Sequence, residues 1–80
     1  MQIHVRFYAS LERHMPVQKE GTFFHEVEVD EGATVEQLLR TLHVPAGAVK
    51  LIFINGIHAQ IDQILKEGDR LGVFPPVAGG

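Results

Sequence analysis

The sequence predicts an α+β fold in which one helix covers one face of a small sheet. Three observations predict it. Residues 2–8 alternate between apolar and polar side chains, one segment after Thr34 has helical spacing, and further strand-like segments follow Pro45. A short helix with a single apolar face has to bury that face, and a sheet is the natural surface to bury it on.

The N-terminal third is expected to hold two strands. The alternation over residues 2–8 is typical of a half-buried strand. Its apolar side carries Ile3, Val5 and Phe7, and its other side carries His4, Arg6 and Tyr8. A helical turn from Ser10 to His14 ends before Pro16. A second strand over residues 22–29 turns Val27 and Val29 inward, and an antiparallel hairpin is the simplest pairing of these two strands.

The helix begins after the break at residues 30–33. Thr34 is the expected N-cap, and Gln37 three residues later completes a capping box. The spacing then places one apolar stripe on the helix, made of Val35, Leu38, Leu39 and Leu42. Pro45 prevents the helix from continuing.

The second half of the chain is expected to contain three more strands. Residues 50–55 form a strand that is apolar on both faces, and Asn55-Gly56 favours a type I′ hairpin turn into a short strand over residues 57–59. Residues 62–65 are expected to form a single helical turn. Gly68-Asp69 then leads into a final strand over residues 70–74, with Leu71 and Val73 inward.

Composition excludes several classes of function. A chain of 80 residues is long enough for one domain and one core. Its net charge of −3 and its scattered basic residues argue against nucleic-acid binding. No apolar run approaches the roughly 20 residues of a membrane span, and no signal peptide is recognisable. The chain has no cysteine, so it cannot carry sulfur on a thiol of its own. We expect a cytoplasmic protein that binds neither nucleic acid nor membrane.

The interior of the chain shows no motif for catalysis or for a metal. Its eight glycines form no phosphate-binding pattern, and Ser10 lacks the sequence context of a nucleophile. The five histidines lack the close pairs that zinc sites show, so no metal site is expected. The carboxylates lie mostly on turns and on outer faces of strands, where solvated surface is their usual role.

One face of the predicted sheet is a candidate docking surface. If Ile52 and Ile54 face the helix, Phe53 lies on the open face of the sheet. Phe74, Tyr8 and Arg6 would share that face, and aromatic and arginine residues are typical interface anchors. In the alternative, the parity of the strand is reversed and Phe53 fills the core.

The last seven residues, Phe-Pro-Pro-Val-Ala-Gly-Gly, differ from an ordinary chain end. Pro75 and Pro76 donate no backbone N–H, so the strand cannot continue through them, and they favour a stiff extended segment. Val77 and Ala78 provide a small apolar grip. Gly79 and Gly80 carry no Cβ, so a narrow tunnel of another protein can close around their backbone.

Residues 65–80, with their Leu-x-x-Gly-Asp turn and the ending Phe-Pro-Pro-Val-Ala-Gly-Gly, resemble the MoaD/ThiS-type sulfur carriers. Within that group they are most similar to the small subunit of molybdopterin synthase. The resemblance implies the ubiquitin-like β-grasp fold, a mixed sheet of four to five strands on one main helix, with the final strand beside the first. It divides the chain into a β-grasp domain, residues 1–74, and a flexible diglycine tail, residues 75–80.

The resemblance also implies the chemistry. A ubiquitin-activating-type enzyme would use ATP to adenylate the carboxylate of Gly80, and a sulfur donor would convert it to a thiocarboxylate. Gly79 and Gly80 are then the reacting end, which enters a large molybdopterin synthase-type subunit and gives its sulfur to a pterin precursor. The chain would be a carrier without catalytic residues or a bound cofactor.

Three alternatives stay open. The acceptor could belong to thiamine synthesis or tRNA thiolation, since carriers of those pathways use the same diglycine chemistry. The chain could instead be a ubiquitin-like modifier joined to lysines of target proteins. It could also be a binding module whose tail has no chemical role.

Overall fold

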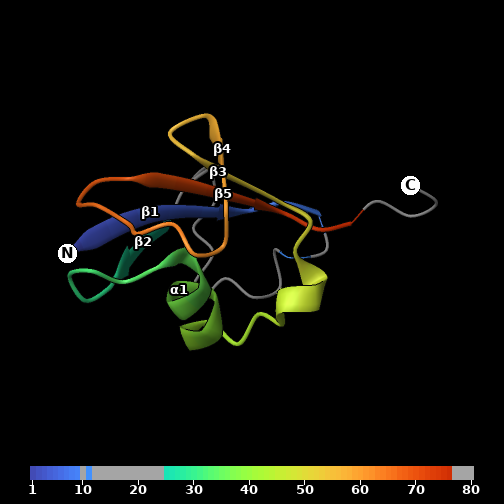
Figure 1. The fold of residues 1–80 in the computed structure, drawn as a ribbon, viewed down its shortest axis with the longest axis horizontal. Coiled ribbons are helices and arrows are strands. Elements are labelled where there is room, and N and C mark those ends of the chain that lie inside the picture. Colours follow the sequence, from blue (N-terminus) through green and yellow to red (C-terminus); the bar gives the residue numbers. More distant parts are fainter. Residues whose placement is uncertain (10, 12–24, 77–80) are drawn as a thin grey trace.

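The computed structural model of the chain describes residues 1–9, 11 and 25–76. Within these residues, five strands form one mixed sheet, and the α-helix lies against one of its faces (Figure 1). The strands are β1 (Gln2–Phe7), β2 (His25–Glu28), β3 (Leu51–Ile54), β4 (Ile57–Ala59) and β5 (Arg70–Phe74). The helices are α1 (Val35–Thr41) and the short 3-10 helix η2 (Ala46–Ala48). The predicted α+β class, and its refinement to a ubiquitin-like β-grasp, are confirmed.

The last strand in the sequence lies in the middle of the sheet. The strand order is β2-β1-β5-β3-β4. Strand β5 runs parallel to β1, with Val5 opposite Leu71, and antiparallel to β3, with Ile52 opposite Val73. The hairpins β1–β2 and β3–β4 are antiparallel, as expected for strands that adjoin in sequence. Strand β5 therefore joins two hairpins into one sheet.

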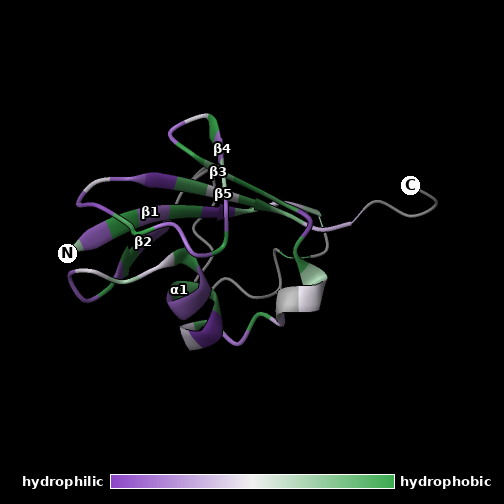
Figure 2. Cartoon of the chain, viewed as in Figure 1, coloured by the Kyte–Doolittle hydropathy of each residue, from purple (hydrophilic) through white to green (hydrophobic). Residues whose placement is uncertain are grey.

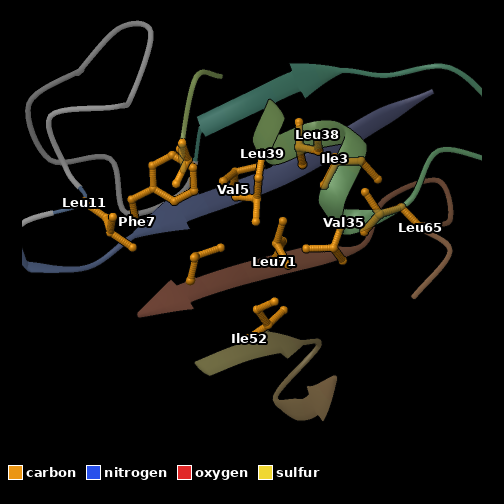
Figure 3. Close-up of a cluster of buried hydrophobic side chains, with 12 residues drawn as sticks. Ile3, Val5, Phe7, Leu11, Val35, Leu38, Leu39, Ile52, Leu65 and Leu71 are labelled. Carbon is orange, nitrogen blue, oxygen red and sulfur yellow. The ribbon is translucent and has the colours of Figure 1, made fainter. Parts of the chain in front are cut away.

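The core lies between the sheet and α1. Strand residues of one parity point into it, and the predicted helix stripe meets them from the other side (Figure 3). The side chains of Ile3, Val5, Leu71 and Val73 are 0% exposed, and Leu38 is 1% exposed. In Figure 2 hydrophilic residues colour much of the outer surface of α1. The buried cluster comprises Ile3, Val5, Phe7, Leu11, Val35, Leu38, Leu39, Val44, Ile52, Leu65, Leu71 and Val73.

The start of α1 has the predicted capping box. The Thr34 Oγ1 atom accepts from the Gln37 backbone N–H at 3.2 Å, and the Gln37 side chain accepts from the Thr34 backbone N–H at 2.9 Å. Two further N–H groups of the first turn donate to a neighbouring segment, Val35 to the Gln63 carbonyl and Glu36 to the Ile61 carbonyl. The first turn of the helix is thus satisfied partly by its own side chains and partly by backbone from residues 61–63.

This contact explains one wrong prediction. Residues 62–65 do not form a helical turn: Ile64 makes an isolated antiparallel bridge with Thr34, and the Leu65 N–H donates to the Ala33 carbonyl at 2.8 Å. The carbonyls at 61 and 63 serve donors of α1, so they are not used for hydrogen bonds within the segment itself. The N–H groups at the start of α1 need acceptors from this segment, and these hydrogen bonds outweigh the local preference of residues 62–65 for a helical turn.

Helix α1 ends before Pro45, where the chain passes through a residue in the left-handed conformation. His43 has a φ of 61°, its N–H donates to the Arg40 carbonyl, and the Val44 N–H donates to the Leu39 carbonyl. This pair of bonds is the Schellman pattern, with Val44 and Leu39 supplying the buried apolar contact.

The remaining predictions of elements are close to the observed bounds. Asn55 and Gly56 have φ values of 54° and 82°, as a type I′ turn requires. The predicted helical turn at residues 10–14 lies largely outside the described residues, as do residues 22–24 of the second predicted strand. No helix in the described ranges is long and apolar enough to cross a membrane.

Candidate partner-binding face and tail

The sheet face turned away from α1 carries a packed aromatic cluster, which consists of Tyr8, Phe53 and Phe74. The rings of Tyr8 and Phe74 stack with their centroids 4.0 Å apart and their planes 8° from parallel. Phe53 meets Phe74 edge to face, with centroids 5.7 Å apart. Phe53 thus lies on the open face, because Ile52 beside it is buried with the core. The alternative in which Phe53 fills the core is wrong.

The face around the aromatic cluster brings together residues of four strands, β1, β5, β3 and β4. Arg6 lies opposite Gly72, which lies opposite Phe53, which lies opposite His58. The Arg6 guanidinium carbon is 4.5 Å from the centre of the Tyr8 ring, a cation–π contact. At the other side, His58 meets Phe53 edge to face at 5.7 Å. The four residues predicted for this face from sequence, Arg6, Tyr8, Phe53 and Phe74, are therefore neighbours.

The same face is hollowed beside the cluster. A depression of about 480 Å³ is lined by the three aromatic residues together with Asn55, Gly56, Arg70 and Gly72. The aromatic rings form apolar walls, and the arginine and the asparagine bring polar groups to the lining. A cavity of this kind suits a side chain from another molecule.

Gly72 occupies the centre of this face, in the central strand. A Cβ atom built there would lie 3.4 Å from Cε2 of Tyr8 and 3.9 Å from Cε2 of Phe74, which is ordinary contact. Two rings thus cover the bare backbone of this strand position. A glycine inside a strand lowers the stability of the fold by about 0.5–1 kcal/mol relative to alanine. Here the missing side chain contributes to the depression beside the two rings.

The polar rim of the depression is held by the turn between β3 and β4. The Asn55 N–H donates to the Arg70 carbonyl at 2.8 Å, and the Arg70 N–H donates to Asn55 Oδ1 at 3.0 Å. Asn55 Nδ2 also donates to Asp69 Oδ1 at 3.0 Å. These bonds fix the backbone of Arg70, while its side chain is exposed.

The sheet ends where the prolines begin. The Phe74 carbonyl accepts from the Lys50 N–H at 2.8 Å, and Pro75 has no N–H with which to continue the ladder. Phe74 and Pro75 are half-buried and Pro76 is exposed. The segment that leads toward the tail therefore leaves from the aromatic cluster itself. Val77, Ala78, Gly79 and Gly80 lie outside the described residues.

The described side chains offer a binding surface. Among the described residues, no polar or charged residue is buried. Across the described ranges, no group of three His, Asp or Glu side chains is placed to hold a metal ion. The depression and the rings can recognise a partner through apolar contact and charge.

The model of the Mut7-C ubiquitin family matches residues 1–79. The chain belongs to the Mut7-C ubiquitin family. No curated protein matches its sequence. The resemblance to MoaD/ThiS-type carriers is confirmed by this match together with solved structures of similar proteins.

Three solved structures illustrate the likeness of this Mut7-C ubiquitin chain. A Pyrococcus furiosus protein, provisionally assigned as subunit 1 of the molybdopterin converting factor, is 28% identical, with a TM-score of 0.67 over 95% of this chain and 98% of that one. SAMP1 from Haloferax volcanii is 24% identical, with a TM-score of 0.70 over 100% of both chains. A chain from the complex of subunits 1 and 2 of the molybdopterin-converting factor of Helicobacter pylori is 22% identical, with a TM-score of 0.59 over 100% of both chains.

Sequence reasoning on this family member missed three residues of the open face. Gly72 was counted only as part of a strand, Asn55 only as a turn residue and Arg70 only as a strand start. A glycine between two inward residues of a central strand was the available signal, since such a position weakens the strand without another reason. Nothing in the sequence signalled that Asn55 and Arg70 are hydrogen-bonded neighbours.

Proposed function

We propose that this chain is a sulfur carrier whose Gly80 carboxylate is activated and converted to a thiocarboxylate, with molybdopterin synthesis as the destination of the sulfur. The observation that carries the proposal is continuity. The aromatic cluster on the open face includes Phe74, and the chain passes from Phe74 directly into Pro75, Pro76 and the diglycine end. A docking face and a slender reactive end are thus adjacent.

The chemistry takes place in two steps on Gly80. A carboxylate oxygen attacks the α-phosphorus of ATP and pyrophosphate leaves, which gives an acyl adenylate. A sulfide donor then attacks the acyl carbon, AMP leaves, and the thiocarboxylate is formed. A thiocarboxylate is ionised at neutral pH, so its sulfur is a nucleophile toward the next substrate.

The body and the tail have separate roles in this mechanism. Six residues follow Phe74, and they can extend at most about 20 Å. That length lets Gly79 and Gly80 enter a tunnel while the folded body stays outside, with Val77 and Ala78 in contact with the tunnel wall. The aromatic cluster, with Arg6, would bind the surface around the tunnel entrance.

The expected partners follow from this division. An adenylating enzyme of the ubiquitin-activating type supplies the ATP site, and a large subunit supplies the acceptor site and the groups that position substrate. The Helicobacter pylori structure, a complex of subunits 1 and 2 of a molybdopterin-converting factor, supports a large-subunit partner. We infer that the chain acts in the cytoplasm as a co-substrate and has no catalytic activity of its own.

A second function is favoured by a different likeness. SAMP1 has the same fold as this chain over the full length of both. Another solved structure describes the Haloferax volcanii protein as small archaeal modifier protein 1. In a modifier the activated Gly80 would be attacked by a lysine amine of a target protein, and an isopeptide would form. Thiamine synthesis and tRNA thiolation are further possible acceptors of a carried sulfur.

Mass spectrometry of the intact protein distinguishes carriage from modification. Incubation with ATP, the adenylating enzyme of the same genome and a sulfide donor is expected to raise the mass by about 16 Da, since sulfur replaces oxygen at Gly80. No mass change in the presence of an active enzyme would contradict carriage. Lysine conjugates in cell extract, identified by a Gly-Gly remnant after digestion, would favour the modifier.

Replacing Phe74 is expected to weaken complex formation more than folding. Phe74→Ala removes the ring that contacts both other members of the aromatic cluster, and we expect at least about a tenfold loss of affinity for the adenylating enzyme, as for an interface hot spot. Because Phe74 is only half-buried, the free energy of unfolding should fall by about 1 kcal/mol. Titration calorimetry and urea denaturation measure the two effects.

The control for Phe74 is Ile64→Ala, since Ile64 is apolar, 56% exposed and does not line the depression beside the cluster. It should leave affinity unchanged. If Phe74→Ala unfolds the protein, the ring belongs to the core and the assignment of a docking role is wrong.

A further inference from the structure

We propose that the partner of this face inserts a bulky apolar side chain into the depression beside Gly72 and places a carboxylate against Arg70. This inference rests on the proposed function, and it names the chemistry of the partner surface. It concerns the depression lined by the aromatic cluster, Asn55, Gly56, Arg70 and Gly72.

The walls of the depression are already packed in the free chain. Tyr8 and Phe74 stack at 4.0 Å, and Phe53 is held edge to face between Phe74 and His58. Rings that support one another in this way lose little further freedom when a partner docks, so most of the apolar contact appears as affinity. An apolar side chain of the partner therefore gains more here than on a surface of loose side chains.

The charge of the lining favours a partner that carries a carboxylate next to this apolar side chain. No aspartate or glutamate lines the depression, whereas Arg70 does. Among the described residues, no carboxylate lies within ion-pair distance of the Arg70 guanidinium. The nearest acidic residue in sequence, Asp69, accepts instead from the Asn55 side chain at 3.0 Å and from the Lys66 N–H at 2.8 Å.

The local charge is thus opposite to the charge of the whole chain. The chain carries a net charge of −3, which by itself favours a basic partner. The lining of the depression instead carries Arg70 and no acidic side chain. A partner surface that matches this depression is apolar at its centre and acidic where it meets Arg70.

A second depression provides a matched control. It lies between the β3–β4 hairpin and the loop before β5 and shares Asn55 with the first depression. Its lining also includes Ile57, Ile64, Lys66 and Asp69. Ile57 is 72% exposed and Ile64 is 56% exposed, so this surface is also apolar with a lysine beside it. A charge reversal at Lys66 changes the net charge of the chain by the same amount as one at Arg70.

The first test compares Arg70→Glu with Lys66→Glu in binding to the adenylating enzyme and to the large subunit of the same genome. We expect Arg70→Glu to weaken binding at least about tenfold, and Lys66→Glu to leave it within about twofold. Wild-type affinity should also fall with added salt, and this dependence should weaken in Arg70→Gln. Equal losses in the two charge reversals would show that only the net charge matters, and would overturn the docking mode.

The second test fills the depression. Gly72→Ala adds a Cβ at ordinary contact distance, and Gly72→Val adds two further methyl groups toward the rings. We expect affinity to fall from wild type to Gly72→Ala to Gly72→Val, with a thermal midpoint for Gly72→Ala at or above the wild-type value. A Gly72→Val protein that folds and binds like wild type overturns the proposal. If that variant does not fold, unchanged affinity of Gly72→Ala has the same meaning.

The outcomes separate this inference from the function on which it rests. A wild-type chain that is neither bound nor thiocarboxylated by active partner proteins contradicts the proposed function and this docking mode together. A chain that is thiocarboxylated normally, and whose Arg70→Glu variant binds normally, contradicts only the docking mode.

Discussion

Removing Gly80 is expected to abolish sulfur transfer while the fold remains intact. The deletion moves the terminal acid back by about 3.3–3.6 Å, one residue of extended chain. A displacement of even about 1 Å from the reacting position can cost about 100-fold in rate, so the loss should be at least of that size. Among the residues that the structure describes, the buried cluster ends at Val73, so folding should be unaffected. The rate of thiocarboxylate formation and the thermal midpoint test the two statements.

A valine at Gly79 is expected to fail for a different reason, because its branched side chain cannot enter a tunnel built for bare backbone. Gly47→Val is the matched control: a Cβ at Gly47 meets no atom within 4 Å. The control should be thiocarboxylated at the wild-type rate.

For the deletion of Gly80, normal sulfur transfer by the shortened chain would rule out the proposed chemistry.

Truncating Leu71 is expected to cause the largest loss of stability. Leu71 is 0% exposed and lies on β5, between Val5 of β1 and Ile54 of β3. Leu71→Ala should cost about 2–5 kcal/mol, because the cavity cannot collapse in the central strand. A domain of this size has only about 5–15 kcal/mol in total, so the variant would be marginally folded. Urea denaturation, with an unchanged slope, measures the loss.

Leu51→Ala is the control for Leu71, since it makes the same change on the neighbouring strand β3. Leu51 is 40% exposed, so its truncation removes little buried area and leaves no enclosed cavity. We expect a loss below about 1 kcal/mol. Similar losses for the two variants would mean that β5 is not the centre of the core.

Much of the fold could be predicted from local patterns because its elements follow their own periodicity. The alternation of β1, the stripe of α1 and the Asn55-Gly56 turn each depend on a few adjacent residues. The central place of β5 did not follow from periodicity, because inward Leu71 and Val73 suit an edge as well as a centre. It followed from resemblance, and the register with β1 and β3 confirms it.

The errors arose where distant segments exchange hydrogen bonds. Residues 62–65 were predicted as a helical turn, but the segment's carbonyls are acceptors for the first turn of α1. Parity placed Arg6, Tyr8 and Phe74 on one face, but it left two options for Phe53, because the strand over residues 50–55 is apolar on both faces. The structure places Phe53 on the same open face. The depression was not predictable, because Gly72, Asn55 and Arg70 come together only through strand pairing and turn contacts.

The order of the strands has a consequence for synthesis of the protein on the ribosome. Until residues 70–74 have left the exit tunnel, β1 and β3 each lack a neighbour on the side that faces the centre of the sheet. A nascent chain that terminates before this point keeps two unpaired strand edges and an open core, which favour degradation or aggregation. Partner enzymes would then meet only those molecules whose translation has run past β5, so that folding checks the chain as far as this strand and not the residues after it.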